Sequence, residues 1–353
     1  MTDARDPASD ARALQERLLP GVSRTFALTI PQLPDDLRPV VTNAYLLCRI
    51  ADTIEDEVPL TPERKQYFHE RFTAVVAERA SPEQFTADLE PLLSSQTLDA
   101  ERMLIREIPR VVRVTFGFSD RQRAAIEQCV RVMCEGMPQF QRNARLSGLS
   151  DMHELERYCY YVAGVVGEML TDLFCAGSSE IERRRPVLAP LATSFGYGLQ
   201  LTNVLKDTWE DRRRGVCWLP RDVFGRAGLD LETLVAGEKS EALAAAFDEL
   251  IGIAHAHLRE ALAYTLAVPP RETGIRRFCL RALGLAVLTL RKIHRNPDFL
   301  AGRQVKVSRR TVRATVITTS LAARSDWMLS RLFQWSAAPL PPATAVKTDL
   351  DPP

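Results

Sequence analysis

The stretch Tyr45–Asp56 combines polar residues at helical spacing with an apolar face, and it constrains the fold more than any other part of the chain. Four polar residues follow the offsets 0, 4, 7 and 11 and so share one side of a helix: Tyr45, Arg49, Asp52 and Asp56. The other side is apolar, with Val40, Val41, Ala44, Leu47, Ile50 and Ile54. Carboxylates beside an apolar face can hold Mg²⁺, which proteins bind through one or two carboxylates together with substrate phosphates. A solvated helix face would give the same local pattern.

A second acidic stripe favours the metal-binding interpretation. In the stretch Gly196–Asp211, the polar residues at offsets 0, 3, 7 and 11 are Gln200, Asn203, Asp207 and Asp211. Apolar contacts around them are expected from Leu199, Leu201, Val204 and Leu205. We expect the two stripes to face each other across a helical bundle. Their carboxylates would then repel unless divalent cations and an anionic ligand lay between them.

The hydrophobic pattern predicts an all-α fold. No segment alternates apolar and polar residues as a half-buried strand would, and no repeat of fixed period is present. We expect an N-terminal arm at 1–20, a helical bundle at 21–336, and a disordered Pro-rich tail at 337–353. A helix over Asp120–Met137 is expected to be interrupted at Pro138.

Composition excludes several classes of function. The net charge of +1 over 353 residues gives no bulk electrostatic basis for binding nucleic acid. Seven cysteines without a CxxC pair or zinc-like spacing indicate reduced, buried thiols and a cytoplasmic location. The N-terminus lacks the apolar segment of a signal peptide, and no run of 18 apolar residues is present.

Two further features have two open interpretations each. Gly164 and Gly167 interrupt a helical pattern, which suggests close approach by another backbone or by a bulky ligand. The stretch Trp327–Trp335 is amphipathic and aromatic. It suits either a helix that caps the core or peripheral contact with a membrane surface.

Five blocks identify a family resemblance. The chain resembles the squalene/phytoene synthases, the head-to-head branch of the isoprenyl diphosphate synthases. The blocks are SRTF at 23–26, YLLCRIADTIEDE at 45–57, YCYYVAGVVGEML at 158–170, GLQLTNVLKDTWED at 198–211 and VKVSRR at 305–310. The resemblance implies that the bundle is a single domain of the all-α isoprenoid-synthase fold with a central cavity. It also implies the condensation of two prenyl diphosphates, with farnesyl diphosphate the expected donor.

The resemblance also implies roles for individual residues. The metal ligands that it implies are Asp52, Asp56, Asp207 and Asp211, with Glu55 as an accessory carboxylate and Asn203 as a further ligand. The diphosphates and the reacting ends are expected near Ser23, Arg24, Phe26, Tyr45, Arg49, Gln200, Asn203 and Lys206. Tyr158 corresponds to a tyrosine with a role in the first half-reaction. Relatives often have arginine where this chain has Lys206, and some have arginine at Val216, so Arg212–Arg214 are candidates to substitute.

The final step that the resemblance implies is hydride transfer from NADPH. No GxGxxG follows a strand, so a Rossmann nucleotide site is not expected. Lys306, Arg309 and Arg310 of VKVSRR are instead candidates to meet the nucleotide phosphate, although a solvated basic loop fits them equally well. The alternatives are a dehydrosqualene, phytoene or hydroxysqualene synthase without the hydride step, and a non-catalytic helical assembly factor. We expect the enzyme to be a monomer.

Overall fold

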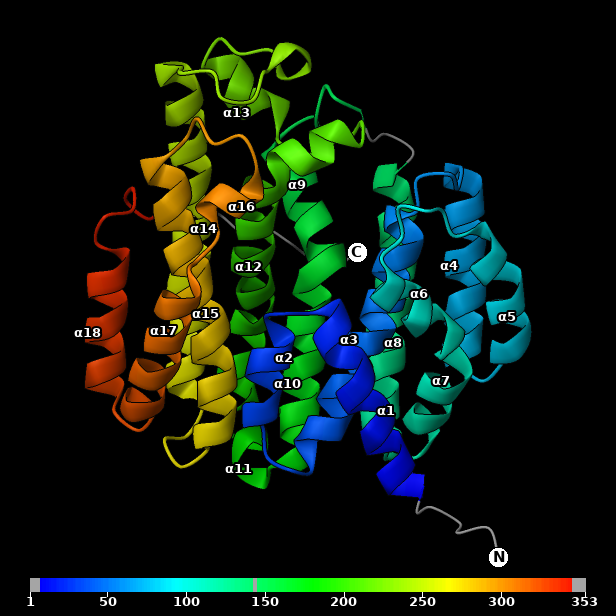
Figure 1. The fold of residues 1–353 in the computed structure, drawn as a ribbon. Coiled ribbons are helices and arrows are strands. Elements are labelled where there is room, and N and C mark those ends of the chain that lie inside the picture. Colours follow the sequence, from blue (N-terminus) through cyan, green and yellow to red (C-terminus); the bar gives the residue numbers. More distant parts are fainter. Residues whose placement is uncertain (1–6, 142–144, 345–353) are drawn as a thin grey trace, which may run out of the picture. The chain divides into compact units, whose positions relative to one another are not determined.

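Helices form the whole of the regular structure. The computed structural model describes residues 7–141 and 145–344, and over those ranges it contains helices α1 to α18 and no β-strand (Figure 1). The prediction of an all-α fold is therefore confirmed. A single isolated parallel bridge, between Leu149 and Pro220, joins two loops within the described ranges.

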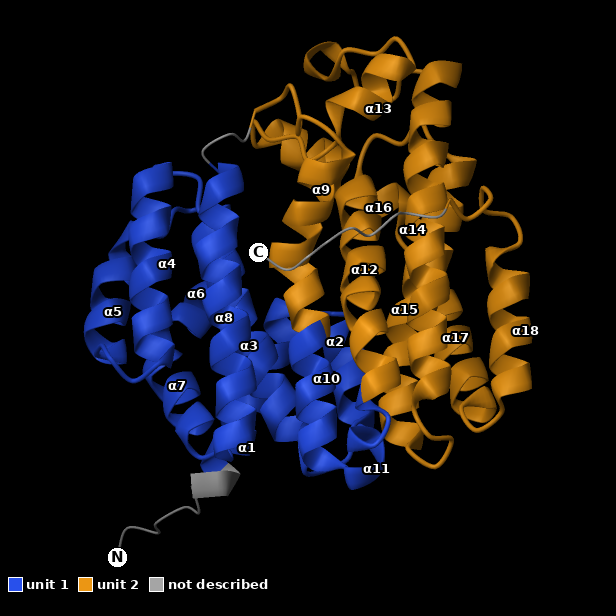
Figure 2. Ribbon diagram, turned by 180° about the vertical axis from the view of Figure 1, so that it is seen from behind, with its two compact units in different colours: residues 1–142, 168–185 blue, residues 143–167, 186–353 orange. Residues whose placement is uncertain are grey.

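The chain divides into two compact units, which Figure 2 colours separately. Unit 1 consists of residues 1–142 and 168–185, and unit 2 consists of residues 143–167 and 186–353. The main helices of unit 1 are α1 (Pro7–Val22), α2 (Phe26–Thr29), α3 (Leu37–Asp56), α4 (Pro62–Val76), α5 (Pro82–Leu89), α6 (Asp99–Arg106), α7 (Ile108–Phe116), α8 (Asp120–Gln141) and α11 (Ser179–Glu182). Helix α10 (Val165–Gly177) begins in unit 2 and continues into unit 1.

Helix α3 carries the first acidic stripe and packs on α8, α7, α4 and α1. Asp36 caps its N-terminus, because the Asp36 carboxylate accepts a hydrogen bond from the backbone N–H of Leu37 at 3.0 Å. All six apolar residues predicted for its inner face are buried, from Val40 to Ile54. Their burial fixes which side of α3 turns outward, and that side holds the polar stripe.

Helix α8 extends beyond the predicted interruption. It continues through Pro138 and ends at Gln141, so the expectation of a break at Pro138 is wrong. Proline at this position removes one helical hydrogen bond, and only three residues of α8 follow it. The extra residues place the Gln141 amide beside Glu55 and Lys65, at 3.0 and 3.1 Å.

Unit 2 consists of long helices joined by loops. Its elements are α9 (Met152–Cys159), a π-helical turn (Tyr160–Gly164), α12 (Arg185–Arg213), α13 (Arg221–Arg226), α14 (Glu241–Ala267), α15 (Thr273–Arg295), α16 (Gly302–Val305), α17 (Arg309–Ala322) and α18 (Asp326–Ala337). A cluster of packed aromatic rings, two pairs edge to face and one stacked, includes Trp209, Phe299, Phe247 and Phe224. Of the predicted tail, residues 337–344 contact α14: Thr344 N–H donates to Gly252 O at 3.1 Å, and Leu340 is buried. The rest of the tail lies outside the described residues.

Close backbone packing explains the glycines of the third sequence block. A Cβ added at Gly167 would lie 2.1 Å from the Ala192 carbonyl oxygen, and one at Gly196 would lie 2.1 Å from that of Ala163. Side chains of α12 also approach Gly164, with Thr193 Cγ2 3.0 Å from the position of its Cβ. The predicted close approach at Gly164 and Gly167 is therefore confirmed, and α12 is the element that makes it.

One described helical stretch, Met152–Gly177, is long and apolar enough to cross a membrane by length and composition alone. Half of its most apolar window is buried inside the protein. The core helix of a soluble protein meets the same criteria, so this stretch carries no assignment.

Candidate functional site

The stripe on α3 is organised around one guanidinium group. Arg49 forms an ion pair with Glu101 of α6, and its nitrogens lie 3.6 Å from an Asp52 oxygen and 3.9 Å from an Asp56 oxygen. Burial raises the pKa of Asp52 to about 6, although the Arg49 charge favours the carboxylate. The structure thus brings Arg49, Asp52 and Asp56 together as predicted and adds Glu101, which the sequence reasoning missed.

Glu55 differs from the two aspartates of the stripe because it is buried. Its carboxylate accepts a hydrogen bond from the Gln141 amide at 3.0 Å, and its backbone carbonyl accepts one from Lys65. Burial raises the pKa of Glu55 to about 8, with a smaller contribution from the charge of Asp56. Through these two hydrogen bonds, Glu55 links the C-terminal end of α3 to α8 and α4.

The other end of the stripe has an aromatic pair. The Phe26 and Tyr45 rings are 4.7 Å apart, and the Tyr45 hydroxyl donates to the Val22 carbonyl at 3.3 Å. Ser23 accepts a hydrogen bond from the Phe26 N–H at 3.0 Å, while Arg24 is exposed. Burial raises the pKa of Tyr45 to about 12, so this hydroxyl keeps its proton at neutral pH. Ser23, Phe26 and Tyr45 therefore form one cluster within unit 1.

The stripe on α12 is more open and has one cation. Lys206 Nζ lies 3.0 Å from an Asp207 oxygen and 3.0 Å from the Asn203 amide oxygen. Gln200, Asp207 and Asp211 are partly exposed and Asn203 is exposed, whereas Leu201, Val204 and Leu205 are buried. The polar side of α12 therefore carries all four predicted residues, and the apolar side faces the core of unit 2.

The residues present fit a cation whose remaining ligands come from elsewhere. Within the described part of the chain, no group of three or more His, Cys, Asp or Glu side chains is arranged to hold a metal ion. Each stripe offers two partly exposed carboxylates at i and i+4. That is the number that Mg²⁺ commonly takes from protein when water and substrate phosphates complete its shell.

The basic segment VKVSRR is connected to the second stripe. Gly302 begins α16, and its N–H donates to the Glu210 carboxylate at 2.9 Å. A Cβ at Gly302 would lie 2.8 Å from the Lys206 carbonyl oxygen and 3.1 Å from an Asp207 oxygen. Four residues later Lys306 follows, and Arg309 and Arg310 open α17, exposed to solvent. Glu210 and Gly302, which the sequence analysis did not single out, thus hold the start of α16, three residues before this segment, against the turn of α12 that carries Asp207.

Two of the arginines considered as substitutes at the diphosphate have other partners. The Arg212 guanidinium donates to the carbonyl oxygens of Leu146, Glu232 and Leu234, at 3.0 to 3.3 Å. Arg213 donates to the Leu300 carbonyl at 2.9 Å. Both side chains therefore hold loops around the end of α12 in this structure.

Tyr158 packs against an aromatic residue that the sequence analysis did not identify. Its ring is stacked on that of Trp218, with centroids 4.2 Å apart and an interplanar angle of 10°. Both side chains are buried. The Trp218 loop is held by the backbone hydrogen bonds Leu149 N–H to Leu219 O (3.0 Å) and Arg221 N–H to Leu149 O (2.8 Å). A paired aromatic surface of this kind can stabilise a nearby cation through its π faces.

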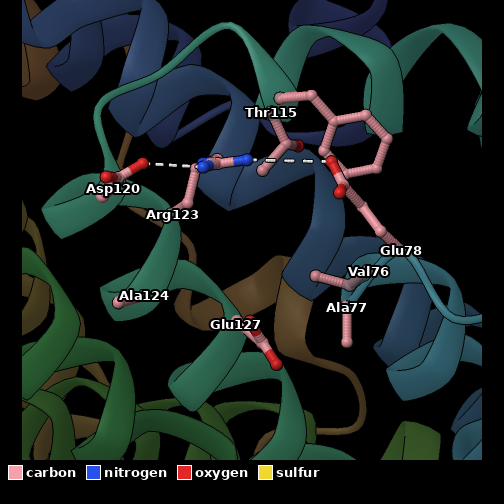
Figure 3. Close-up of a pocket in the computed structure, with 9 residues that line it drawn as sticks. Val76, Ala77, Glu78, Thr115, Asp120, Arg123, Ala124 and Glu127 are labelled. Carbon is pink, nitrogen blue, oxygen red and sulfur yellow. Dashed lines mark hydrogen bonds and ion pairs between the residues drawn. The ribbon is translucent and has the colours of Figure 1, made fainter.

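Unit 1 also contains a pocket of about 240 Å³, which is lined by residues of α4, α7 and α8 and not by the first acidic stripe. Figure 3 shows Arg123 between Asp120, at 2.7 Å, and Glu78, at 3.7 Å. None of the predicted site residues lines this pocket, and its one arginine is neutralised by two acids. It is therefore not a candidate for binding the substrate.

Comparison with known proteins agrees with the motif blocks. Residues 19–311 match the family model described as squalene/phytoene synthase. A squalene synthase of Gibberella zeae is 30% identical over 312 residues, a match that covers 86% of this chain and 64% of the relative. This chain thus spans somewhat less than two thirds of the length of that relative.

Solved structures share the fold. A ligand complex of TcSQS has a TM-score of 0.73 at 22% identity, covering 97% of this chain and 94% of that one. A dehydrosqualene synthase in complex with ligand has a TM-score of 0.66 at 21% identity, covering 91% of this chain and 100% of that one. At these identities the likeness establishes the helical architecture.

Proposed function

Because the chain belongs to the squalene/phytoene synthase family, we propose that it condenses two farnesyl diphosphates head to head and reduces the product to squalene. One donor loses its diphosphate, and the C2–C3 double bond of the second attacks the allylic cation. Loss of a proton then gives a cyclopropyl diphosphate. This intermediate ionises in turn, rearranges and accepts a hydride.

The two acidic stripes are proposed to bind the diphosphates through Mg²⁺, with Asp52 and Asp56 on one helix and Asp207 and Asp211 on the other. Bound Mg²⁺ would supply Lewis-acid stabilisation of the departing diphosphate. Arg49 and Lys206 each lie among the carboxylates of their stripe and would add positive charge where the diphosphate leaves. The pairing of both cations with aspartates supports this role, because each is held in position before substrate arrives.

Aromatic side chains are proposed to protect the carbocations. The stacked pair Tyr158 and Trp218 and the pair Phe26 and Tyr45 present π faces, and a desolvated cation gains about 2 kcal/mol from such a face. The Tyr45 hydroxyl is neutral at physiological pH, and burial moves its pKa further from that range, to about 12, so it presents no anion that would trap the cation.

The observation that carries the reductive assignment is the contact of Gly302 with the Asp207 turn. Gly302 precedes Lys306 by four residues, so this contact brings the chain that leads into the segment of Lys306, Arg309 and Arg310 to the second acidic stripe, where a reductant would be needed. Exposed cations at the N-terminus of α17 suit a nucleotide phosphate. NADPH bound there would supply the hydride.

Product analysis tests this proposal. Purified protein is incubated with farnesyl diphosphate and Mg²⁺, with and without NADPH. Squalene should appear only with NADPH, and a triple variant Lys306→Gln, Arg309→Gln, Arg310→Gln should lower squalene more than it lowers consumption of substrate. The same products in both incubations would contradict the reductive step and favour dehydrosqualene, phytoene or hydroxysqualene as product.

Retention of all four aspartates favours an enzyme over a helical assembly factor. We also propose a cytoplasmic monomer as the working form. Sedimentation of the active protein tests the oligomeric state.

A further inference from the structure

Helices α17 and α18 expose large apolar side chains to an unusual degree. Among the described residues, the three most exposed large apolar side chains are Leu321 (76%), Trp335 (72%) and Trp327 (71%), and all three lie within 15 residues of one another. Ile317 of α17 and Met328 of α18 are exposed as well. We call these five side chains the tryptophan face.

The exposure is a fixed property of the packing. Leu329 is buried and Leu332 is partly buried against Leu280 of α15, so the opposite side of α18 already faces the core of unit 2. The turn between the two helices is held by Arg276, which is fully buried and donates to Asp326 at 2.7 Å and to the Ala323 carbonyl at 3.2 Å. Figure 1 and Figure 2 both show α18 along the outer edge of unit 2.

The charges beside the tryptophan face are positive. Residues 311–337 contain three arginines, Arg313, Arg324 and Arg331, and one acid, Asp326, which is paired with Arg276. The Arg331 guanidinium lies 6.0 Å from the Trp327 ring, and that of Arg291 lies 5.9 Å from the Trp335 ring. Each exposed tryptophan therefore has a guanidinium beside it.

On α18 the apolar and basic residues form one stripe. Trp327, Arg331 and Trp335 follow the offsets 0, 4 and 8 on α18, Met328 is next to Trp327, and all four are exposed. Arg324 is also exposed and lies in the turn just before α18. Tryptophan favours the boundary between lipid headgroups and acyl chains, and a neighbouring arginine can reach the phosphates while its methylene groups stay in the apolar layer. A helix with this pattern binds in the plane of a membrane surface.

From these observations we infer that the tryptophan face docks the protein on an anionic membrane surface. A second copy of this chain is a poorer occupant, because a two-fold contact would place the arginines of one face against those of the other. The inference does not depend on the proposed reaction, since no residue assigned to chemistry lies on this face.

Vesicle flotation of the full chain tests the inference. The protein should float with vesicles that contain phosphatidylglycerol and remain largely unbound with vesicles of phosphatidylcholine alone. The double variant Trp327→Ser, Trp335→Ser and the double variant Arg324→Glu, Arg331→Glu should each weaken binding by about tenfold or more. Because all four side chains are exposed, the thermal transition should stay that of the unmodified protein.

Matched controls separate this surface from exposed residues in general. Val235→Ser removes an exposed apolar side chain of unit 2, and Arg64→Glu with Arg79→Glu makes the same charge change on exposed residues of unit 1. Both controls should float like the unmodified protein. The inference is overturned if the full chain does not bind anionic vesicles, if the tryptophan variant binds as well as the controls, or if the face instead mediates self-association that the tryptophan variant abolishes.

Discussion

The two acidic stripes have the same spacing but are held in place by different means. On α3, side-chain charge fixes the stripe, because Arg49 is shared among Glu101, Asp52 and Asp56. On α12, the backbone fixes the stripe, because Gly196 admits the Ala163 carbonyl and Gly302 lies against the Asp207 turn. The comparison teaches that two aspartates with DxxxD spacing can be held in place in two ways. One is a network of ion pairs, and the other is close backbone packing at glycines.

The largest effect is expected from removing carboxylates. Asp52→Asn and Asp207→Asn should each lower the rate of diphosphate release from farnesyl diphosphate by about a hundred- to a thousandfold, because each removes charge needed to hold the cation. Asp35 is an exposed acid of unit 1, so Asp35→Asn is the control and should leave the rate of diphosphate release unchanged. Near-normal turnover in either stripe variant would show that the two stripes do not share one function.

Gly196→Ala probes the backbone mechanism on α12. The new Cβ would lie 2.1 Å from a backbone oxygen, so the helices must separate, at a cost of about 3 kcal/mol in the free energy of unfolding. Gly225→Ala, in helix α13 with nothing within 4 Å, should leave stability unchanged or raise it slightly. Equal melting temperatures for the two variants would refute close packing at Gly196.

Glu101→Gln probes the ion-pair mechanism on α3. Loss of the buried carboxylate leaves the Arg49 charge less well compensated and should lower the free energy of unfolding by about 2 kcal/mol. Denaturant unfolding measures this value. If Glu101→Gln unfolds like the unmodified protein, charge does not position the first stripe.

An effect shared by both helices, and graded with pH, is expected on acidification. His69 donates to the Ala51 carbonyl on α3 at 3.1 Å, and His257 contacts the Ser194 hydroxyl on α12 at 3.2 Å. Burial lowers the pKa of each to about 4 from the ordinary 6.5, so between those values the unfolded chain binds more protons than the folded one. Stability is therefore complete above pH 6.5 and falls as the pH drops toward 4, by at most about 3 kcal/mol for each histidine.

Melting temperatures measured across that range check the prediction, with His69→Gln and His257→Gln compared with the unmodified protein. Each variant should show a shallower fall in melting temperature with acidification. An unchanged slope in both variants would mean that other groups govern acid stability.

Patterns within single helices were predictable from the sequence. The apolar sides of both stripes and the close approach at Gly164 and Gly167 follow from spacing and side-chain size. The partners were not predictable, because they come from distant parts of the chain: Glu101 lies 52 residues from Arg49, and nothing in the spacing of α6 points to it. Gln141 was missed for a different reason, since α8 continues for three residues beyond Pro138 although proline disfavours continuation of a helix.

The most direct test of the account is calorimetric titration of the full chain with inorganic pyrophosphate in the presence and absence of Mg²⁺. We predict binding that requires Mg²⁺ and that is strongly weakened both in Asp52→Asn with Asp56→Asn and in Asp207→Asn with Asp211→Asn. Binding that persists with a chelator, or that neither double variant changes, would contradict the claim that the two acidic stripes bind the diphosphates through magnesium.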